Sequence, residues 1–143
     1  QYAALKEGEP PLPGTLYTRG TASNPEYGTP GEWPCPMISC MVAEWAYGHV
    51  ITGGFDATLR VWDLKLACCE LRLQGHTRGV RCVAVDFSRH EAVSGSDDSD
   101  LRLWDLKIGT CVRILTGHRA AVQCVSVDWV ERQVVSSSQG LER

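Results

Sequence analysis

The chain has 143 residues, of which 43% are hydrophobic and 22% are charged, a composition typical of a soluble globular domain. Its formal net charge of -3 provides no basic surface of the kind that binds nucleic acid or an anionic membrane, so neither partner is expected. Its apolar runs are interrupted well before the roughly 18 residues that a membrane-spanning helix needs.

The amino-terminal segment differs in composition from the rest of the chain. All seven prolines fall between residues 10 and 36, interspersed with glycines, which predicts a linker or extended arm over residues 1–33. The chain begins without methionine and without the basic and apolar regions of a secretory signal. This beginning suggests a fragment of a longer protein or a processed chain.

Beyond the arm, the chain repeats itself with a period of 42 residues. Residues 51–65 (ITGGFDATLRVWDLK) align with residues 93–107 (VSGSDDSDLRLWDLK), and residues 80–87 align with residues 122–129. Within each unit, large apolar and β-branched residues form short runs with a period of two, and turn-forming clusters such as residues 97–100 separate them. The pattern predicts four short strands in each unit of about 40 residues.

Five of the seven cysteines follow the same period. Cys40, Cys82 and Cys124 share one repeat position, and Cys69 and Cys111 share another. We expect them to be small buried hydrophobic residues in strands. The odd total and the absence of C-x-x-C spacing indicate a reduced protein, in the cytoplasm or alternatively the nucleus, with no cofactor and no metal ion.

Dipeptides at matching ends of the units carry a resemblance to a known family. Gly75-His76 and Gly117-His118 begin two units, and Trp62-Asp63 and Trp104-Asp105 stand in register with them. From about residue 34 onward, the chain resembles the WD-repeat β-propeller family. The resemblance implies an all-β fold, a partial propeller of four-stranded antiparallel blades. The blades are expected at residues 34–75, 76–117 and, incompletely, 118–143.

The resemblance also implies a hydrogen-bonded chain of side chains buried inside a blade. Such a chain is chemically reasonable because Trp only donates and Asp only accepts, whereas Ser and His can each do both. It stabilises a blade only when every member is satisfied. The implied members are His76, Ser94, Asp98 and Trp104, with Thr52, Asp56, Trp62, His118 and Ser136 at matching positions of the neighbouring units.

The same residues could be interpreted as the Ser, His and Asp of a hydrolase. The chain has no G-x-S-x-G elbow, however, and the set partly recurs in the neighbouring units, which is unusual for an active site. A calcium loop beginning at Asp98 would need Gly at its sixth position and Glu at its twelfth, where the sequence has Leu103 and Gly109. We therefore expect no catalytic residues, no metal ion and no enzyme activity.

The sequence departs from the family pattern in ways that bear on its partners. Trp33-Pro34 stands where the first unit should show Gly-His, Gly140 replaces the third turn aspartate, and no third Trp-Asp follows. Propellers have four to eight blades, and this chain holds about two and a half, so it cannot close a ring alone. The expected partners are other proteins or the missing blades of the same propeller.

In propellers of this family, partners usually dock on the face formed by the loops that enter the innermost strand and by the turn before the network aspartate. These positions fall on Ser39, Arg81 and Gln123 in the innermost strands and on Phe55, Asp97 and Gln139 in the turns. Phe55 is the most informative because aromatic residues are enriched at interface hot spots. The predicted function is a non-catalytic scaffold that presents this face to other proteins.

An alternative is a regulatory or substrate-recognition part of a larger enzyme, such as a ubiquitin ligase subunit or a kinase. Both Trp-Asp-Leu-Lys ends resemble the box by which some WD-repeat proteins dock onto the adaptor of cullin-type ubiquitin ligases. That box ends in Arg, whereas these ends carry Lys65 and Lys107. Lys lacks the planar fork of Arg, so the exchange is not conservative and a solvated turn residue is favoured.

Overall fold

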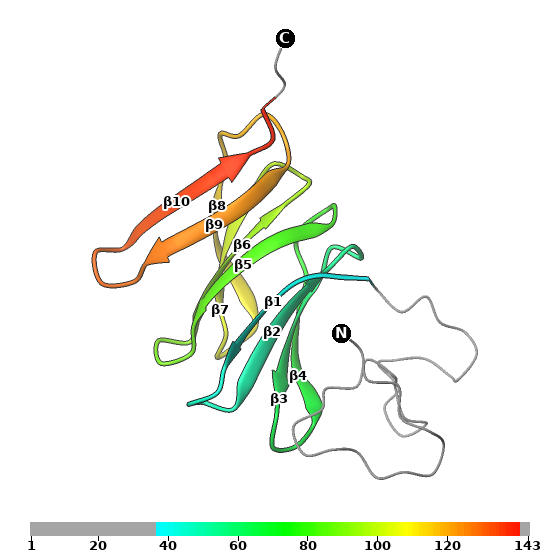
Figure 1. The fold of residues 1–143 in the computed structure, drawn as a ribbon, viewed down its shortest axis with the longest axis vertical. Coiled ribbons are helices and arrows are strands. Elements are labelled where there is room, and N and C mark those ends of the chain that lie inside the picture. The colour runs from blue at the N-terminus through cyan, green and yellow to red at the C-terminus, as the bar shows by residue number, and fades with distance from the viewer. Residues whose placement is uncertain (1–36, 141–143) are drawn as a thin grey trace, which may run out of the picture.

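The computed structural model describes residues 37–140, which form ten strands and no helix. The strands make three antiparallel sheets (Figure 1). The all-β, partial-propeller fold predicted from the repeats is thereby confirmed. The arm predicted for residues 1–33 lies outside the described residues, and within residues 37–140 no helix is long and apolar enough to cross a membrane.

Each sheet follows the order of the chain. The first contains β1 (Ile38–Glu44), β2 (His49–Gly54), β3 (Leu59–Asp63) and β4 (Cys68–Leu73). The second contains β5 (Val80–Asp86), β6 (Glu91–Ser96), β7 (Leu101–Asp105) and β8 (Thr110–Leu115). The third contains, within the described residues, β9 (Val122–Asp128) and β10 (Gln133–Ser138).

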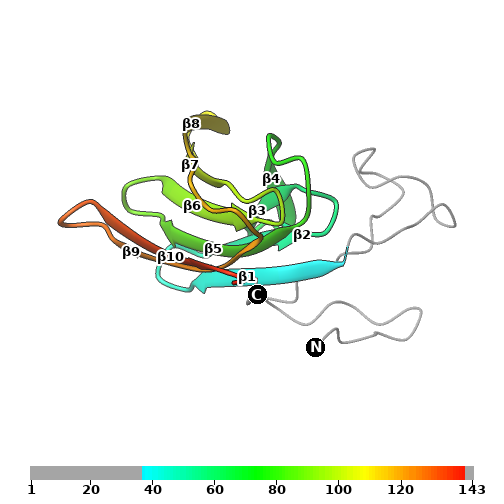
Figure 2. The same cartoon turned by 90° about the horizontal axis from the view of Figure 1, so that it is seen from above.

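The three sheets lie side by side, with their first strands next to one another (Figures 1 and 2). β5 contacts β1 and β2 of the preceding sheet, and β9 contacts β5 and β6. The first strand of each sheet is therefore the innermost strand of a propeller blade, and the last strand of each complete sheet is the outermost.

The hydrophobic core lies between the sheets. Ile51 and Val61 of the first sheet share one buried cluster with Val80 and Trp104 of the second. A smaller cluster joins the second sheet to Val122 of the third. Because each sheet covers its neighbour's apolar face, no blade buries its hydrophobic residues alone.

Positive backbone φ angles repeat with the same period as the sequence. Gly48, His90 and Arg132 have φ angles of 68°, 56° and 59°, although only the first of them is glycine. The hairpin turns that join the first two strands of each sheet thus share one backbone shape. Residues other than glycine rarely adopt positive φ angles. The repeat geometry, and not the residue type, therefore sets the conformation of these turns.

Gly53 and Gly95 allow the innermost strand of the next sheet to approach closely. A Cβ atom at Gly53 would lie 2.7 Å from a methyl carbon of Val80 and 2.7 Å from the Cys40 sulfur. A Cβ atom at Gly95 would lie 2.6 Å from a methyl carbon of Val122 and 2.7 Å from the Cys82 sulfur. Each sheet thus packs on its neighbour at a position where no side chain can be accommodated.

The repeated cysteines lie in strands, but they are not all buried as predicted. Cys40, Cys82 and Cys111 are partly buried, and Cys124 is exposed. Cys124 lies on β9, which no further sheet covers within the described residues. Burial, together with the nearby thiols of Cys40 and Cys124, raises the pKa of the Cys82 thiol to about 11, so this residue remains protonated at neutral pH.

Replacing Gly95 with alanine is expected to destabilise the fold, because the added methyl group would overlap Val122 and the Cys82 sulfur. Overpacking of this kind costs about 1–3 kcal/mol of unfolding free energy. Urea unfolding monitored by circular dichroism should measure the loss. Gly140→Ala is the control, since nothing lies within 4 Å of its added Cβ atom. Equal stability of the two variants would contradict the close approach.

Candidate functional site

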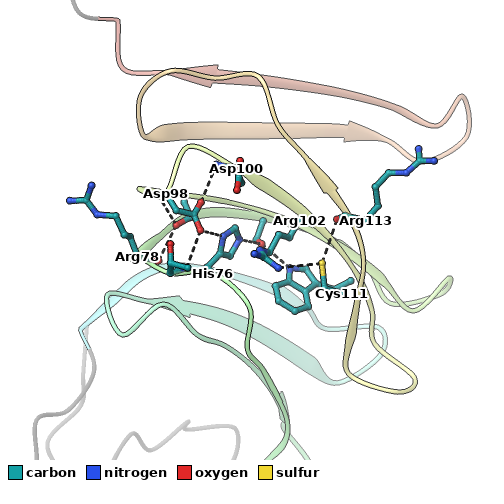
Figure 3. Close-up of polar contacts among 11 residues, drawn as sticks. His76, Arg78, Asp98, Asp100, Arg102, Cys111 and Arg113 are labelled. Atoms are coloured by element: carbon teal, nitrogen blue, oxygen red, sulfur yellow. Dashed lines mark hydrogen bonds and ion pairs between the residues drawn. The ribbon is translucent and has the colours of Figure 1, made fainter.

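A continuous hydrogen-bonded chain crosses the second sheet (Figure 3). The Trp104 indole N–H donates to the Ser94 hydroxyl oxygen at 2.8 Å, and that oxygen lies 2.7 Å from Nε2 of His76. Nδ1 of His76 lies 2.8 Å from Oδ2 of Asp98. One proton arrangement satisfies every group: Ser94 donates to Nε2, and the Nδ1–H of a neutral His76 donates to the carboxylate.

The turn around Asp98 anchors the acidic end of this chain. Oδ2 of Asp98 also accepts the backbone N–H of Thr77 at 3.1 Å, and Oδ1 accepts the backbone N–H of Asp100 at 3.0 Å. Burial alone would raise the pKa of Asp98, but these bonds and the bond from His76 outweigh it and lower the pKa. Asp98 therefore remains ionised and fully engaged in the turn.

His76 is held in its neutral form. Its side chain is fully buried, and burial is the largest cause that lowers its pKa. The charge of Arg102 acts in the same direction, and the pKa stays lowered despite the hydrogen bond and charge of Asp98. Ser94 is also fully buried. Its hydroxyl proton and its oxygen are both used inside the chain of hydrogen bonds, which gives the hydroxyl no exposed position from which to attack a substrate.

The first sheet contains an abbreviated version of the same chain. Trp62 donates its indole N–H to the Thr52 hydroxyl at 3.0 Å. The position that matches His76 is Pro34 in the sequence, which cannot supply an imidazole. Asp56 instead accepts the Thr58 hydroxyl at 2.8 Å and a guanidinium N–H of Arg60 at 3.0 Å.

The third sheet retains a single link of the chain. Nε2 of His118 lies 2.7 Å from the Ser136 hydroxyl oxygen, and both residues are only partly buried. Gly140 occupies the position of the turn aspartate. The complete arrangement of four side chains is thus present in the second sheet, and only single links of it are present in the other two.

A β-bulge explains the placement of the three predicted contact residues on the innermost strands. The pairing register shifts between Ile38 and Cys40, between Val80 and Cys82, and at the matching point of β9. The residues left out of the pairing are Ser39, Arg81 and Gln123. Bulges redirect the extra side chain, so these residues lie apart from the regular alternation of the strand.

Backbone hydrogen bonds bring the three turn positions to the same end of the sheets. The N–H groups of Phe55, Asp97 and Gln139 donate to the carbonyl oxygens of Met37, Gly79 and Ala121, at distances of 3.0, 2.9 and 3.0 Å. Each acceptor precedes a bulge residue by two positions. The structure therefore places all six predicted contact residues at one end of the three sheets.

Three of the six side chains form a cluster that spans two sheets. Nε of Arg81 donates to Oδ1 of Asp97 at 2.7 Å, and the guanidinium carbon lies 5.1 Å from the centre of the Phe55 ring. Phe55 is 44% exposed. Gly79 makes room for both neighbours, since a Cβ atom there would lie 3.0 Å from the Phe55 ring and 3.3 Å from the Asp97 carboxylate.

The other three predicted contact residues do not join this cluster. The Ser39 hydroxyl is directed at the backbone carbonyl oxygens of Gly53 and Val80, so it connects the first two sheets. Gln123 is partly buried and Gln139 is exposed, both on the third sheet's side of this end. The cluster of Phe55, Arg81 and Asp97, named the top cluster below, is the best-defined partly exposed site among the predicted residues.

Another polar cluster was not selected from the sequence. His49, Asp63 and Glu70 each place one potential ligand atom within 4.8 Å of the others. The repeat alignment shows that two of these residues are particular to the first unit, because the positions that match His49 and Glu70 in the second unit hold Glu91 and Val112. Residues that differ between the units are not identified by recurrence, so the repeat pattern did not predict this cluster.

Comparison with known proteins agrees with this geometry. The family model described as WD domain, G-beta repeat matches residues 35–63, 67–105 and 109–140, more than half of the chain. The chain belongs to the WD-repeat family. The WD repeat at residues 67–105 contains β4 of one sheet and β5, β6 and β7 of the next, so one sequence repeat contributes strands to two blades.

Two relatives carry similar WD-repeat segments. The chain is 38% identical over 48 residues to WD repeat-containing protein 86 of Homo sapiens, covering 34% of the chain and 13% of that protein. It is 39% identical over 44 residues to Nuclear distribution protein nudF 2 of Aspergillus clavatus, covering 31% of the chain and 10% of that protein. The similarity therefore spans only a small part of either relative. WD repeats are generally non-catalytic interaction domains.

Ser94→Ala should lower the unfolding free energy by about 1–3 kcal/mol, because it leaves the buried Trp104 N–H and His76 Nε2 without their partner. Ser136→Ala, at the matching repeat position, removes one bond in a partly buried site and should cost less. Chemical denaturation of both variants measures the difference. A larger loss in Ser136→Ala would refute the importance of the continuous chain.

Stability is expected to fall as the pH is lowered below 6.5, the ordinary pKa of histidine, towards the lowered pKa of His76. Over this range the unfolded chain binds a proton that the folded chain excludes, so the contribution of His76 is complete above the range and lost within it. Asp98 acts in the same direction at more acid pH, since its pKa is lowered from 3.8.

Denaturation series between about pH 8 and about pH 5 test this dependence. His76→Gln should lower stability at the upper pH and flatten the decline. His90→Asn changes an exposed histidine and should keep the decline of the unaltered chain. If both variants retain the same slope, His76 is not its source.

Proposed function

We propose that this WD-repeat chain is a non-catalytic scaffold that binds other proteins through the end of the sheets that carries the top cluster. The observation that supports this most directly is the contact of Arg81 with both Phe55 and Asp97 across two blades. The three residues occupy positions that hold different side chains in the different units, whereas parts of the hydrogen-bonded chain behind them recur. Variable residues on a repeated framework are well suited to recognition.

The physical chemistry of the top cluster suits a protein partner. Arg81 is held along one edge by Asp97 and over one face by Phe55, so it loses little conformational freedom on binding. The hydrogen bond with Asp97 raises the pKa of Arg81, which therefore remains charged. Aromatic residues and arginine are both enriched at protein interfaces, and the top cluster presents one of each.

The hydrolase alternative has no support from the geometry. Ser94 is fully buried, and its hydroxyl bonds to His76 and Trp104 on the inside of the blade. A nucleophilic serine needs access to substrate and an oxyanion site beside it. The hydrogen-bonded chain is better explained as the support that holds the turn carrying Asp97.

Phe55→Ala and Arg81→Glu are each expected to reduce the capture of bound proteins by about tenfold or more, the loss typical of a hot-spot residue. Quantitative mass spectrometry of proteins captured on the immobilised chain measures this. Leu66→Ala is the matched control, because Leu66 is 72% exposed and lies in the β3–β4 turn at the other end of the first sheet. Unchanged capture by both top-cluster variants would remove the proposed surface.

A further inference from the structure

The polar cluster of His49, Asp63 and Glu70 lies at the opposite end of β2 from Phe55. Its residues come from β2, β3 and β4, so all three belong to the first sheet. A cavity of about 370 Å³ lined by His49 and Glu70, among others, opens beside it. The cluster is accessible, with 27% of the His49 side chain and 40% of the Glu70 side chain exposed.

Strand register brings the three side chains together. His49 and Asp63 are directly opposite each other in the antiparallel pairing of β2 and β3. The pairing of β3 with β4 shifts register where Val61 pairs with Leu71 and Trp62 with Cys69, which leaves Glu70 as the extra residue of a bulge. The bulge frees Glu70 from the alternation of β4 and allows it to face His49.

The hydrogen bonds of His49 define what its second ring nitrogen can do. Nδ1 lies 2.8 Å from the backbone carbonyl oxygen of Tyr47, which can only accept, so Nδ1 carries a proton. In the neutral ring, Nε2 then holds a lone pair, which points at Oε2 of Glu70 at 3.1 Å. A lone pair facing a carboxylate oxygen is unfavourable, so either a proton or a metal ion lies between the two atoms.

The orientation of His49 is typical of a metal ligand. Metal-binding histidines almost always donate the other ring N–H to a carbonyl or carboxylate group. The ring is also packed against Phe87 of the second sheet, with centroids 5.3 Å apart. Asp63 is ordered as well, because its Oδ1 accepts the backbone N–H groups of Lys65 and Leu66 at 2.7 and 2.9 Å.

The cluster does not recur in the second unit, whereas the Trp–hydroxyl link of the hydrogen-bonded chain is present in both the first and the second. Asp105 matches Asp63, but Glu91 and Val112 occupy the positions of His49 and Glu70. Glu91 forms an ion pair with Arg132 of the third sheet instead. A framework role would predict the same residues in both units, so the unique set points to a property of the first blade alone.

We propose that His49, Asp63 and Glu70 bind one Zn²⁺ ion, with water in the remaining coordination position. Imidazole and carboxylate groups are ordinary Zn²⁺ ligands, and a site with three protein ligands keeps an open position. Tetrahedral Zn²⁺ holds its ligand atoms about 3.4 Å apart. The distance of 3.1 Å between His49 and Glu70 is close to this value, and no pair of ligand atoms exceeds 4.8 Å.

Titration of the full chain with Zn²⁺ tests the site. Binding is measured by calorimetry and by the NMR resonances of the histidine ring nitrogens. We expect one saturable equivalent that changes Nε2 of His49. His49→Gln and Glu70→Gln should each weaken Zn²⁺ binding by at least about tenfold. Removing a group that only hydrogen-bonds to a metal ligand already costs about that much, and removing the ligand itself should cost more. Asp63 is left unaltered because it also caps the turn after β3.

His90→Asn is the matched control, since His90 lines the same cavity but lies outside the cluster. It should bind Zn²⁺ as the unaltered chain does. Binding that persists in both Gln variants would place the ion on other groups, such as the cysteine thiols, and would overturn the proposal. The absence of saturable binding to the unaltered folded chain would overturn it as well.

Discussion

The close approach of each innermost strand to the preceding sheet is the constraint on which the other features depend. Gly53 and Gly95 permit it, because any side chain at either position would overlap the next sheet. This approach buries Trp104 and Val80 in one shared core. It also brings Arg81 on the second sheet within reach of Phe55 on the first, so the top cluster exists only when the two sheets are packed.

The hydrogen-bonded chain adds a polar constraint to this packing. It links the second sheet's interior, at Trp104, to the turn that carries Asp97 and Asp98, and thereby fixes the turn relative to the strands. Every polar atom in the chain is satisfied by a neutral histidine, which suits a buried position. The first sheet has no histidine at the matching position and holds its turn through Arg60 and Thr58 instead. Its turn is thus held by a partly exposed ion pair, a weaker support.

The sequence predicted the fold well, because the strands recur with the 42-residue period. The hydrogen-bonded chain is complete only in the second sheet, because Pro34 and Gly140 stand where the neighbouring units would need His and Asp. The sequence predicted the burial of the cysteines less well, since burial depends on whether a neighbouring sheet covers the strand, as Cys124 shows. It assigned Ser39 to the contact surface from its repeat position alone. At the bulge, the Ser39 hydroxyl instead donates to the backbone carbonyl of Gly53, which the sequence does not reveal. Glu70 could not be placed beside His49, because a bulge in a strand pairing determines which way it faces.

Recurrence therefore separates two kinds of residue in this chain. A residue repeated between units, such as Trp62 and Trp104, serves the packing that the two complete blades share. A residue that differs between units at an exposed position is free of that requirement, and its chemistry can serve recognition or binding. Phe55 and His49 are both of this second kind, at opposite ends of β2. The two ends of one strand can therefore change independently, because each relies on the framework between them and not on the other end.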